Sequence, residues 1–218
     1  MNQYKPCIRL ETPSDYHAAE VLTREAFWND YVPGCDEHYL LHVMRSSAAF
    51  LPELTFVAEL DGCLVGHIAY VKAYILGDNG QRHEVLCFGP ISVLPEYQGI
   101  GVGSALIEHS KQAAATLGYT SIFLLGDPAY YGRLGFIPAE RFDIRTAEDV
   151  YLDPLQVVEL VPGALNGISG RFFEGEAYTF DSDEVASFDA AFSPKERQAG
   201  LPSQIRFQEL VAMQKPRK

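Results

Sequence analysis

The sequence predicts a mixed α/β fold in which helices flank a largely hairpin-connected sheet. Segments with strand character alternate along the chain with segments of helical period, and several neighbouring strands are joined by turn sequences rather than by helices. Apolar residues make up 47% of the 218 residues, which is enough to build a sizeable core. We therefore expect one domain, or one domain with an appendage.

The first elements are a strand and two helices. Residues 7–11 form a short apolar strand. Thr12 follows as a helix N-cap, with Pro13 in the first helical position and Asp15 where the acid of a capping box stands. A second short helix fits residues 36–46, whose apolar positions share one face.

A β-hairpin and a long strand follow. Residues 54–60 alternate between apolar and other side chains, and residues 63–75 form the returning strand. Asp61 and Gly62 between them are typical of a type I′ turn. A further turn leads to a strand near residues 83–94.

The second half of the fold begins with a helix over 101–117, which Gly118 ends. We expect a buried strand at 120–125, a short helix within 127–136 and a further strand at 155–161. One side of the long helix is predicted to carry Val102, Ala105, Leu106, Ala113 and Leu117.

Beyond about residue 165 the patterns weaken, because aromatic and acidic residues mix without a clear period. We expect this extension to lie on or beside the core and its last residues to fray. Its acidic cluster of Asp181, Asp183 and Glu184 is interpreted as a solvated turn, or else as part of a substrate pocket.

Composition narrows the class of protein. The net charge of −12 argues against nucleic-acid partners and anionic membranes, both of which favour clustered cations. The polar N-terminus lacks a secretory leader, and no apolar run is long enough to span a membrane. Four scattered cysteines are interpreted as reduced and mostly buried. These observations predict a soluble cytoplasmic protein.

Gly99, Gly101 and Gly103 stand where the long strand turns into a helix. A turn without Cβ atoms at a helix N-terminus lets a phosphate approach unpaired N–H groups, although such glycines also occur for packing alone. A nucleotide P-loop is excluded because no Lys-Ser or Lys-Thr follows, and the dinucleotide fingerprint needs different glycine spacing. A pyrophosphate loop of the form VLPEYQGIGVG remains.

At this point the sequence resembles the GCN5-related N-acetyltransferase (GNAT) superfamily, and more narrowly a bacterial subgroup of predicted N-acetyltransferases. The resemblance rests on ISVLPEYQGIGVGSALIEHSKQAAATLGY, on IFLLGDPAYYGRLGF, and on the upstream order of strand, two helices and hairpin. It covers roughly residues 5–165. It implies a twisted, mostly antiparallel mixed sheet splayed between its fourth and fifth strands and flanked by about four helices. It also implies a GNAT domain at 1–165 and a C-terminal extension at 166–218.

The resemblance implies acetyl-CoA as cosubstrate and no metal. The loop backbone would hold the pyrophosphate, with Gln98 shaping the loop, and pantetheine would pair with the strand edge as an added strand. The implied cofactor-binding residues are Ile91, Ser92, Val93, Gln98, Gly99, Ile100, Gly101, Val102, Gly103, Ser104 and Tyr131.

Catalysis is implied for two residues. Tyr131 matches the family's tyrosine that protonates the departing thiolate, whereas the adjacent Tyr130 would point about 100° away on a helix. Glu84 is the candidate general base, although strand parity favours Val85 and Cys87 as the substrate-facing positions.

The sequence departs from the family's motif at one position, because Leu124 stands where an asparagine often binds the cofactor. Asp127 nearby is suited to cap the following helix. Two further patterns give only weak indications of a functional site. Cys35, His38 and His42 have the spacing of zinc ligands on a helix, but no fourth ligand accompanies them. Ser169 lacks the last glycine of the Gly-x-Ser-x-Gly motif of a catalytic serine.

The sequence thus predicts an acetyl-CoA-dependent N-acetyltransferase that transfers acetyl directly to a primary amine. The acceptor, a small molecule or a peptide, is left open, and a homodimer is compatible with the sequence. A covalent route through Cys87 is a lesser alternative. The alternative from another class is a non-catalytic CoA-sensing or protein-binding module that keeps the fold.

Overall fold

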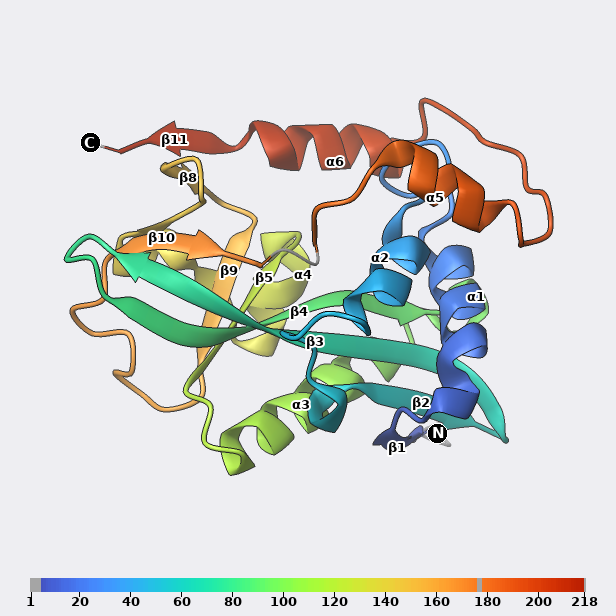
Figure 1. Cartoon of the computed structure of the whole chain (residues 1–218), viewed down its shortest axis with the longest axis horizontal. Helices are drawn as coiled ribbons and strands as arrows, with labels where there is room; N and C mark the ends of the chain where they lie inside the picture. The colour runs from blue at the N-terminus through green and yellow to red at the C-terminus, as the bar shows by residue number, and fades with distance from the viewer. Residues whose placement is uncertain (1–4, 176–177, 218) are drawn as a thin grey trace.

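A nine-stranded sheet forms the centre of the protein, which is described here for residues 5–175 and 178–217 in a computed structural model (Figure 1). The hairpin predicted around Asp61-Gly62 is present, and both residues have the positive φ angles that a type I′ turn needs, 51° and 79°. The strands of this sheet are β1 (Cys7–Leu10), β2 (Phe56–Leu60), β3 (Cys63–Gly77), β4 (Arg82–Val93), β5 (Ser121–Leu125), β6 (Ile137–Pro138), β7 (Ile144–Arg145), β9 (Leu155–Glu159) and β10 (Gly170–Phe173).

The sheet is mixed and mostly antiparallel. Its main path runs β1-β2-β3-β4-β5-β9-β6, and only the β4–β5 and β7–β10 pairs are parallel. β10 pairs with the far end of β3, where Phe173 lies opposite Tyr74. A strand from beyond residue 165 is therefore built into the central sheet.

Six α-helices surround the sheet in the described residues, where about four were expected. None of these helices has both the length and the apolar character needed to cross a membrane. They are α1 (Tyr16–Phe27), α2 (Glu37–Met44), α3 (Val102–Thr116), α4 (Pro128–Tyr131), α5 (Ser182–Asp189) and α6 (Pro202–Ala212).

The helix ends follow the predicted chemistry. Thr12 N–H donates to Asp15 Oδ2 at 2.8 Å before α1, and the Asp127 carboxylate caps α4 by accepting from Ala129 N–H at 2.8 Å. Gly118 ends α3 with a φ of 88°.

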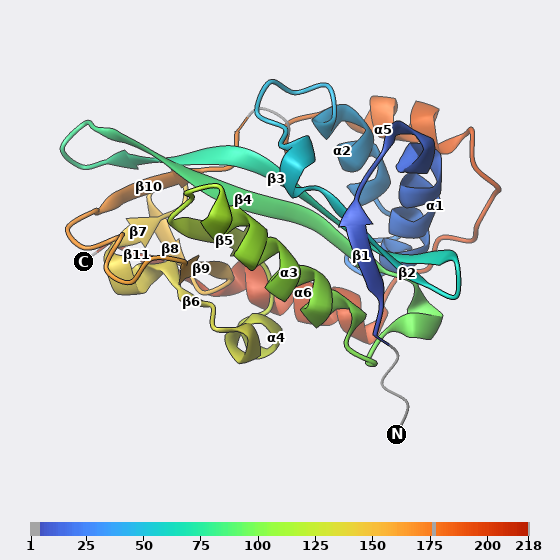
Figure 2. The ribbon, with the colours of Figure 1, turned by 90° about the horizontal axis from the view of Figure 1, so that it is seen from below.

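The two faces of the sheet carry separate apolar cores. Leu86 and Phe88 of β4 pack with α3 on one face, whereas Val85 and Cys87 pack toward α1 and α2 on the other. Figure 2 shows α3 on one side of β3 and β4, with α1 and α2 on the other side. The buried residues of α3 differ in part from the predicted set. Of that set Val102 and Leu106 are buried, Ala105 and Ala113 are partly buried, and Leu117 is exposed at 52% because the helix has already ended there. The other buried residues are Ile107, Ser110 and Ala114.

The C-terminal extension forms elements that the sequence patterns missed. Asp181 caps α5 in a capping box with Glu184, so these acids begin a helix and are not a turn. Figure 1 shows α6 lying across the top of the molecule between α5 and the β8 side. The final residues, expected to fray, form β11 (Gln214–Pro216) paired with β8 (Val150–Leu152); Lys218 lies outside the described residues.

The extension holds the loop between α1 and α2. Gln204 of α6 is buried, and its Nε2 donates to the carbonyls of Asn29 at 3.0 Å and Gln198 at 2.8 Å. Phe207 stacks on Tyr31 with ring centroids 4.8 Å apart. These contacts join segments about 175 residues apart in sequence.

Replacing Gln204 with alanine should lower the free energy of unfolding by about 2 kcal/mol, because buried carbonyls lose their donors. Gln208 lies exposed on the same helix, and its replacement with alanine should cost only about 0.5 kcal/mol or less. Urea denaturation of both variants measures the difference. Equal stabilities would show that α6 does not depend on this contact.

Candidate active site

Strands β4 and β5 part after a short parallel ladder. Their pairing consists of Leu86 with Ile122 and Cys87 with Phe123, whereas β4 continues to Val93. Leu94 N–H donates to Val65 O on the β3 side at 3.0 Å. Because successive residues of a strand point their N–H and C=O groups to opposite sides, those of Val93 face the opening. The sheet thus presents a free backbone edge, as the splayed fold predicts.

The glycine loop lies at the far end of this opening. Gly99 and Gly101 have φ angles of 74° and 97°, and a Cβ added to either would meet nothing within 4 Å. Gly101 is the N-cap of α3 and provides no side-chain cap, so the first N–H groups of the helix stay available for an anion. Gln98 Nε2 donates to Val93 O at 3.0 Å and ties the loop to the strand.

A pocket of about 600 Å³ joins the loop, the open edge of β4 and α4. It brings together most of the predicted cofactor-binding residues, together with four residues that were not predicted. The predicted residues at its wall are Ile91, Val93, Gln98, Gly99, Gly101, Val102, Gly103, Ser104 and Tyr131, and the additional ones are Tyr97, Tyr130, Arg133 and Leu134.

Ser92 and Ile100 do not line this pocket. Ser92 is buried, and its hydroxyl donates to Thr23 Oγ1 at 2.9 Å on the α1 face. The side chain of Ile100 is 50% exposed at the outer turn of the loop. Leu124, where a polar cofactor contact was missing from the motif, is buried in the core on the α3 face.

Tyr131 lies at the inner end of the pocket. Its ring packs against Phe88 and Phe136, with centroid distances of 6.0 Å and 5.9 Å. Burial, reinforced by neighbouring tyrosines, raises the pKa of Tyr131 far above its usual value. The hydroxyl therefore stays protonated at neutral pH and can donate a proton or a hydrogen bond.

Tyr130 also lines the pocket, contrary to the expectation that it points away. Its hydroxyl lies 3.0 Å from the position that a Cβ on Gly103 would occupy, so it covers the start of α3. Arg133 lies with its guanidinium 5.2 Å from the Tyr130 ring centroid and adds a cation to the pocket wall. The predicted short helix within 127–136 is a single α-helical turn, which contains both tyrosines, followed by a 3-10 turn at Gly132–Leu134.

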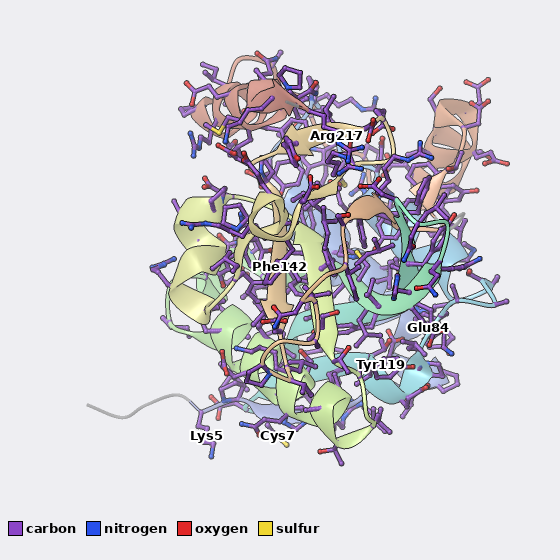
Figure 3. The ribbon with its side chains drawn as sticks, turned by 90° about the vertical axis from the view of Figure 1, so that its left-hand side faces the viewer. Lys5, Cys7, Glu84, Tyr119, Phe142 and Arg217 are labelled. Carbon is purple, nitrogen blue, oxygen red and sulfur yellow. The ribbon has the colours of Figure 1, made fainter. Side chains whose placement is uncertain are left out.

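Glu84 is not brought to the pocket. It lies on the α3 face at the distant end of β4, opposite Tyr74, and forms an exposed ion pair with Lys72 at 3.3 Å. Figure 3 shows Glu84 and Tyr119 near one another at that end. The side chain is 59% exposed, as a solvated strand-end acid would be. Regular pairing with β3 from Arg82 to Phe88 leaves no bulge that would change its face.

Cys87 faces the α2 side of the sheet at the point where the strands part. It is 1% exposed, and burial raises the pKa of its thiol well above the usual value. A buried protonated thiol is a weak nucleophile, which disfavours the covalent route. Cys35 is also buried, but Cys7 and Cys63 are exposed, so the expectation of mostly buried thiols holds for only half of them.

No group of three or more potential metal ligands converges within residues 5–175 and 178–217. His38 lies with Nε2 3.1 Å from Asp189 Oδ1 and Nδ1 3.5 Å from Cys35 Sγ. His42 instead contacts Glu20, with Nδ1 3.0 Å from Oε1. The two histidines therefore contact different residues and do not point to a common site.

A methyl group at Gly126 should disturb Tyr131, because an added Cβ would overlap the tyrosine ring and lie 2.8 Å from Cδ2. We expect Gly126→Ala to lower kcat about tenfold by displacing the hydroxyl. Gly132→Ala in the same segment is the control, since a Cβ there meets nothing within 4 Å. Steady-state kinetics and thermal unfolding would separate misplacement from unfolding. Wild-type kcat in Gly126→Ala would contradict a fixed position of Tyr131.

The fold and the site define an α/β protein with a splayed sheet and a glycine-loop anion pocket. Comparison with known families agrees: the model of the acetyltransferase (GNAT) family matches residues 21–136. The chain belongs to this family.

Its relatives include the uncharacterized N-acetyltransferase YhbS of Escherichia coli K12, which is 29% identical over 163 residues, 75% of this chain and 92% of that protein. The crystal structure of Escherichia coli YhbS in complex with CoA has a TM-score of 0.71, with 28% identity over 80% of this chain and 92% of that chain. A GNAT acetyltransferase of Brucella melitensis in complex with acetyl-CoA has a TM-score of 0.63, with 28% identity over 81% of this chain and 99% of that chain.

Proposed function

We propose that this protein is an N-acetyltransferase that transfers the acetyl group of acetyl-CoA directly to a primary amine on a small molecule or a peptide. The observation that carries the proposal is one pocket that is lined by the glycine loop, the open edge of β4 and Tyr131. Complexes of two relatives with CoA and acetyl-CoA support it.

The pocket fits the cosubstrate chemically. The bare loop at Gly99 and Gly101 leaves room that a side chain would fill, and the N-terminus of α3 favours negative charge there. Arg133 and the Tyr130 hydroxyl add a cation and a donor beside the loop. The N–H group of Val93 and the N–H and C=O groups of Ile91 suit an amide-containing arm, which would pair with them as an added strand does.

The residues divide the chemistry between them. Acetyl-CoA supplies an activated acetyl group as a thioester. Tyr131, held protonated by burial, donates a hydrogen bond and then a proton to the departing sulfur. The apolar ring contacts of Tyr131 exclude water from that end of the pocket and strengthen the hydrogen bond.

Two measurements test this function. Isothermal titration with CoA should show one site per chain, and CoA release from acetyl-CoA should accelerate on adding amines from a panel of aromatic, aliphatic, polyamine and peptide acceptors. Binding of CoA without turnover of any amine would favour a CoA-sensing module. No binding of CoA would refute the assignment of the pocket.

A further inference from the structure

A second and larger pocket, of about 1120 Å³, lies across the sheet from the glycine loop. Its walls include the end of α2, the strand β10 and residues 174–175 and 178–180. We call it the α2-side pocket. Six aromatic residues and three carboxylates are among the residues that line it. Phe172 belongs to the core on the α2 side of the sheet, and the other aromatic residues are Tyr39, Tyr74, Phe173, Tyr178 and Phe180.

This pocket reaches the place where β4 and β5 part. The hydroxyl of Tyr178 donates to Gly89 O at 3.2 Å and lies 3.9 Å from Cys87 Sγ. Cys87 is the last residue of β4 that pairs with β5, and Leu125 at the end of β5 also lines the pocket. Tyr131 contacts Phe88 from the opposite face at the same point. The two pockets therefore approach one reaction centre from the two sides of the sheet.

Glu174 follows β10 directly and lines the α2-side pocket four residues before Tyr178. It is half-buried, and no cation in residues 5–175 and 178–217 forms an ion pair with it. Burial and the negative charge of Glu148 raise its pKa to about 7. It shares this pocket with Tyr178, whose hydroxyl contacts Gly89 O at the point where the strands part.

The other charges around the pocket are engaged elsewhere or lie farther along its rim. Lys72 pairs with Glu84, and the Arg82 guanidinium stacks 3.7 Å from the Tyr74 ring centroid. Glu184 belongs to the capping box of α5. The lining therefore combines aromatic residues with the carboxylates of Glu174 and Glu148, an environment that attracts a cation.

We propose that Glu174 is the catalytic base of the acceptor side, and that it takes the proton from the ammonium group of an amine whose apolar body lies against the aromatic wall. The inference rests on the proposed function. It adds a catalytic carboxylate from the C-terminal extension, outside the segment that matches the family model.

The proton balance is complete. Glu174 accepts one proton from the ammonium nitrogen, and the freed lone pair forms the C–N bond as the C–S bond breaks. Tyr131 gives its proton to sulfur and regains one from the amide nitrogen through solvent. Glu174 then returns its proton to water, so each turnover releases one proton.

The test compares E174Q, E148Q and E84Q in the full-length protein. CoA release from acetyl-CoA is followed between about pH 5.5 and pH 9.5, with 2-phenylethylamine as the probe amine and with water alone as the acceptor. Wild-type kcat/KM should rise through an acid limb with a midpoint near 7, where Glu174 loses its proton. E174Q should lose about 10²-fold at neutral pH and should lack this limb.

The E148Q variant tests the pKa of Glu174 while the proposed base itself is retained. Removing the charge of Glu148 should lower the pKa of Glu174 and move the acid limb to lower pH. CoA affinity, measured by titration calorimetry, should be unchanged in both variants, because neither residue lines the glycine-loop pocket.

Three results would overturn the inference. One is an unchanged pH profile in E174Q, and another is an acid limb that E148Q does not move. The third is loss of the limb in E84Q rather than in E174Q. By contrast, wild-type protein that releases no CoA with either acceptor would refute the proposed function, and the assignment of Glu174 would fall with it.

Discussion

Replacing Tyr131 with phenylalanine should lower kcat about 10²- to 10⁴-fold, the usual contribution of general acid catalysis. The ring contacts with Phe88 and Phe136 do not involve the hydroxyl, so the variant should fold normally. The Kd of CoA should change little, because phenylalanine keeps the shape of the pocket wall. Single-turnover kinetics with acetyl-CoA and calorimetry with CoA measure the two effects separately.

Tyr130 offers a matched control for this variant. It lies in the same turn and the same pocket, but its hydroxyl covers Gly103 at the start of α3. Tyr130→Phe should therefore raise the Kd of CoA a few-fold, about 1 kcal/mol for one hydrogen bond, and leave kcat close to wild type. If Tyr130→Phe instead lost kcat and Tyr131→Phe did not, the roles of the two tyrosines would be exchanged.

A methyl group on Gly101 should raise the Kd of CoA about 10²-fold, which corresponds to roughly 2.7 kcal/mol of binding. The methyl would project into open space at the pocket wall, where the loop must approach a phosphate closely. Its φ of 97° also strains any L residue, so the variant should lose about 1 kcal/mol of stability. Calorimetry and urea denaturation measure both changes.

The Gly118→Ala variant separates the effect of backbone strain from the effect of a methyl group that blocks the pocket. Gly118 lies at the other end of α3, has a similar φ of 88° and also leaves its Cβ in open space, but it does not line the pocket. The variant should lose a similar amount of stability and bind CoA normally. Equal CoA affinities in Gly101→Ala and Gly118→Ala would show that the loop does not hold the cosubstrate.

Local sequence chemistry predicted the elements that position the glycine-loop pocket. Asp61-Gly62 closes its turn through positive φ angles, and Gly118 ends α3 in the same way. Such turns depend on the backbone conformation of one or two residues, so they can be identified from the sequence without knowledge of tertiary contacts. The glycine spacing at 99–103 likewise predicted a bare loop at a helix start, which the structure contains.

The extension could not be predicted in this way, because its contacts are distant in sequence. The Asp189 carboxylate accepts from Arg24 Nε at 2.6 Å, across 165 positions of the chain. Gln204 is a polar residue that is buried because it donates hydrogen bonds to carbonyl groups. A helix buried in this way does not show the apolar periodicity by which a sequence predicts a buried helix face. Glu174 escaped sequence analysis for the same reason: its raised pKa depends on burial and on Glu148, and neither is visible in a single strand pattern.

The placement of β10 has a practical consequence for dissecting this protein. Cutting the chain at residue 165 would strip the outer edge of β3 between Tyr74 and Gly77, leaving main-chain donors and acceptors unpaired. Uncovered strand edges recruit other chains, so the shortened product should form insoluble aggregates rather than a minimal catalyst. The C-terminal extension should therefore protect the edge of the central sheet from aggregation.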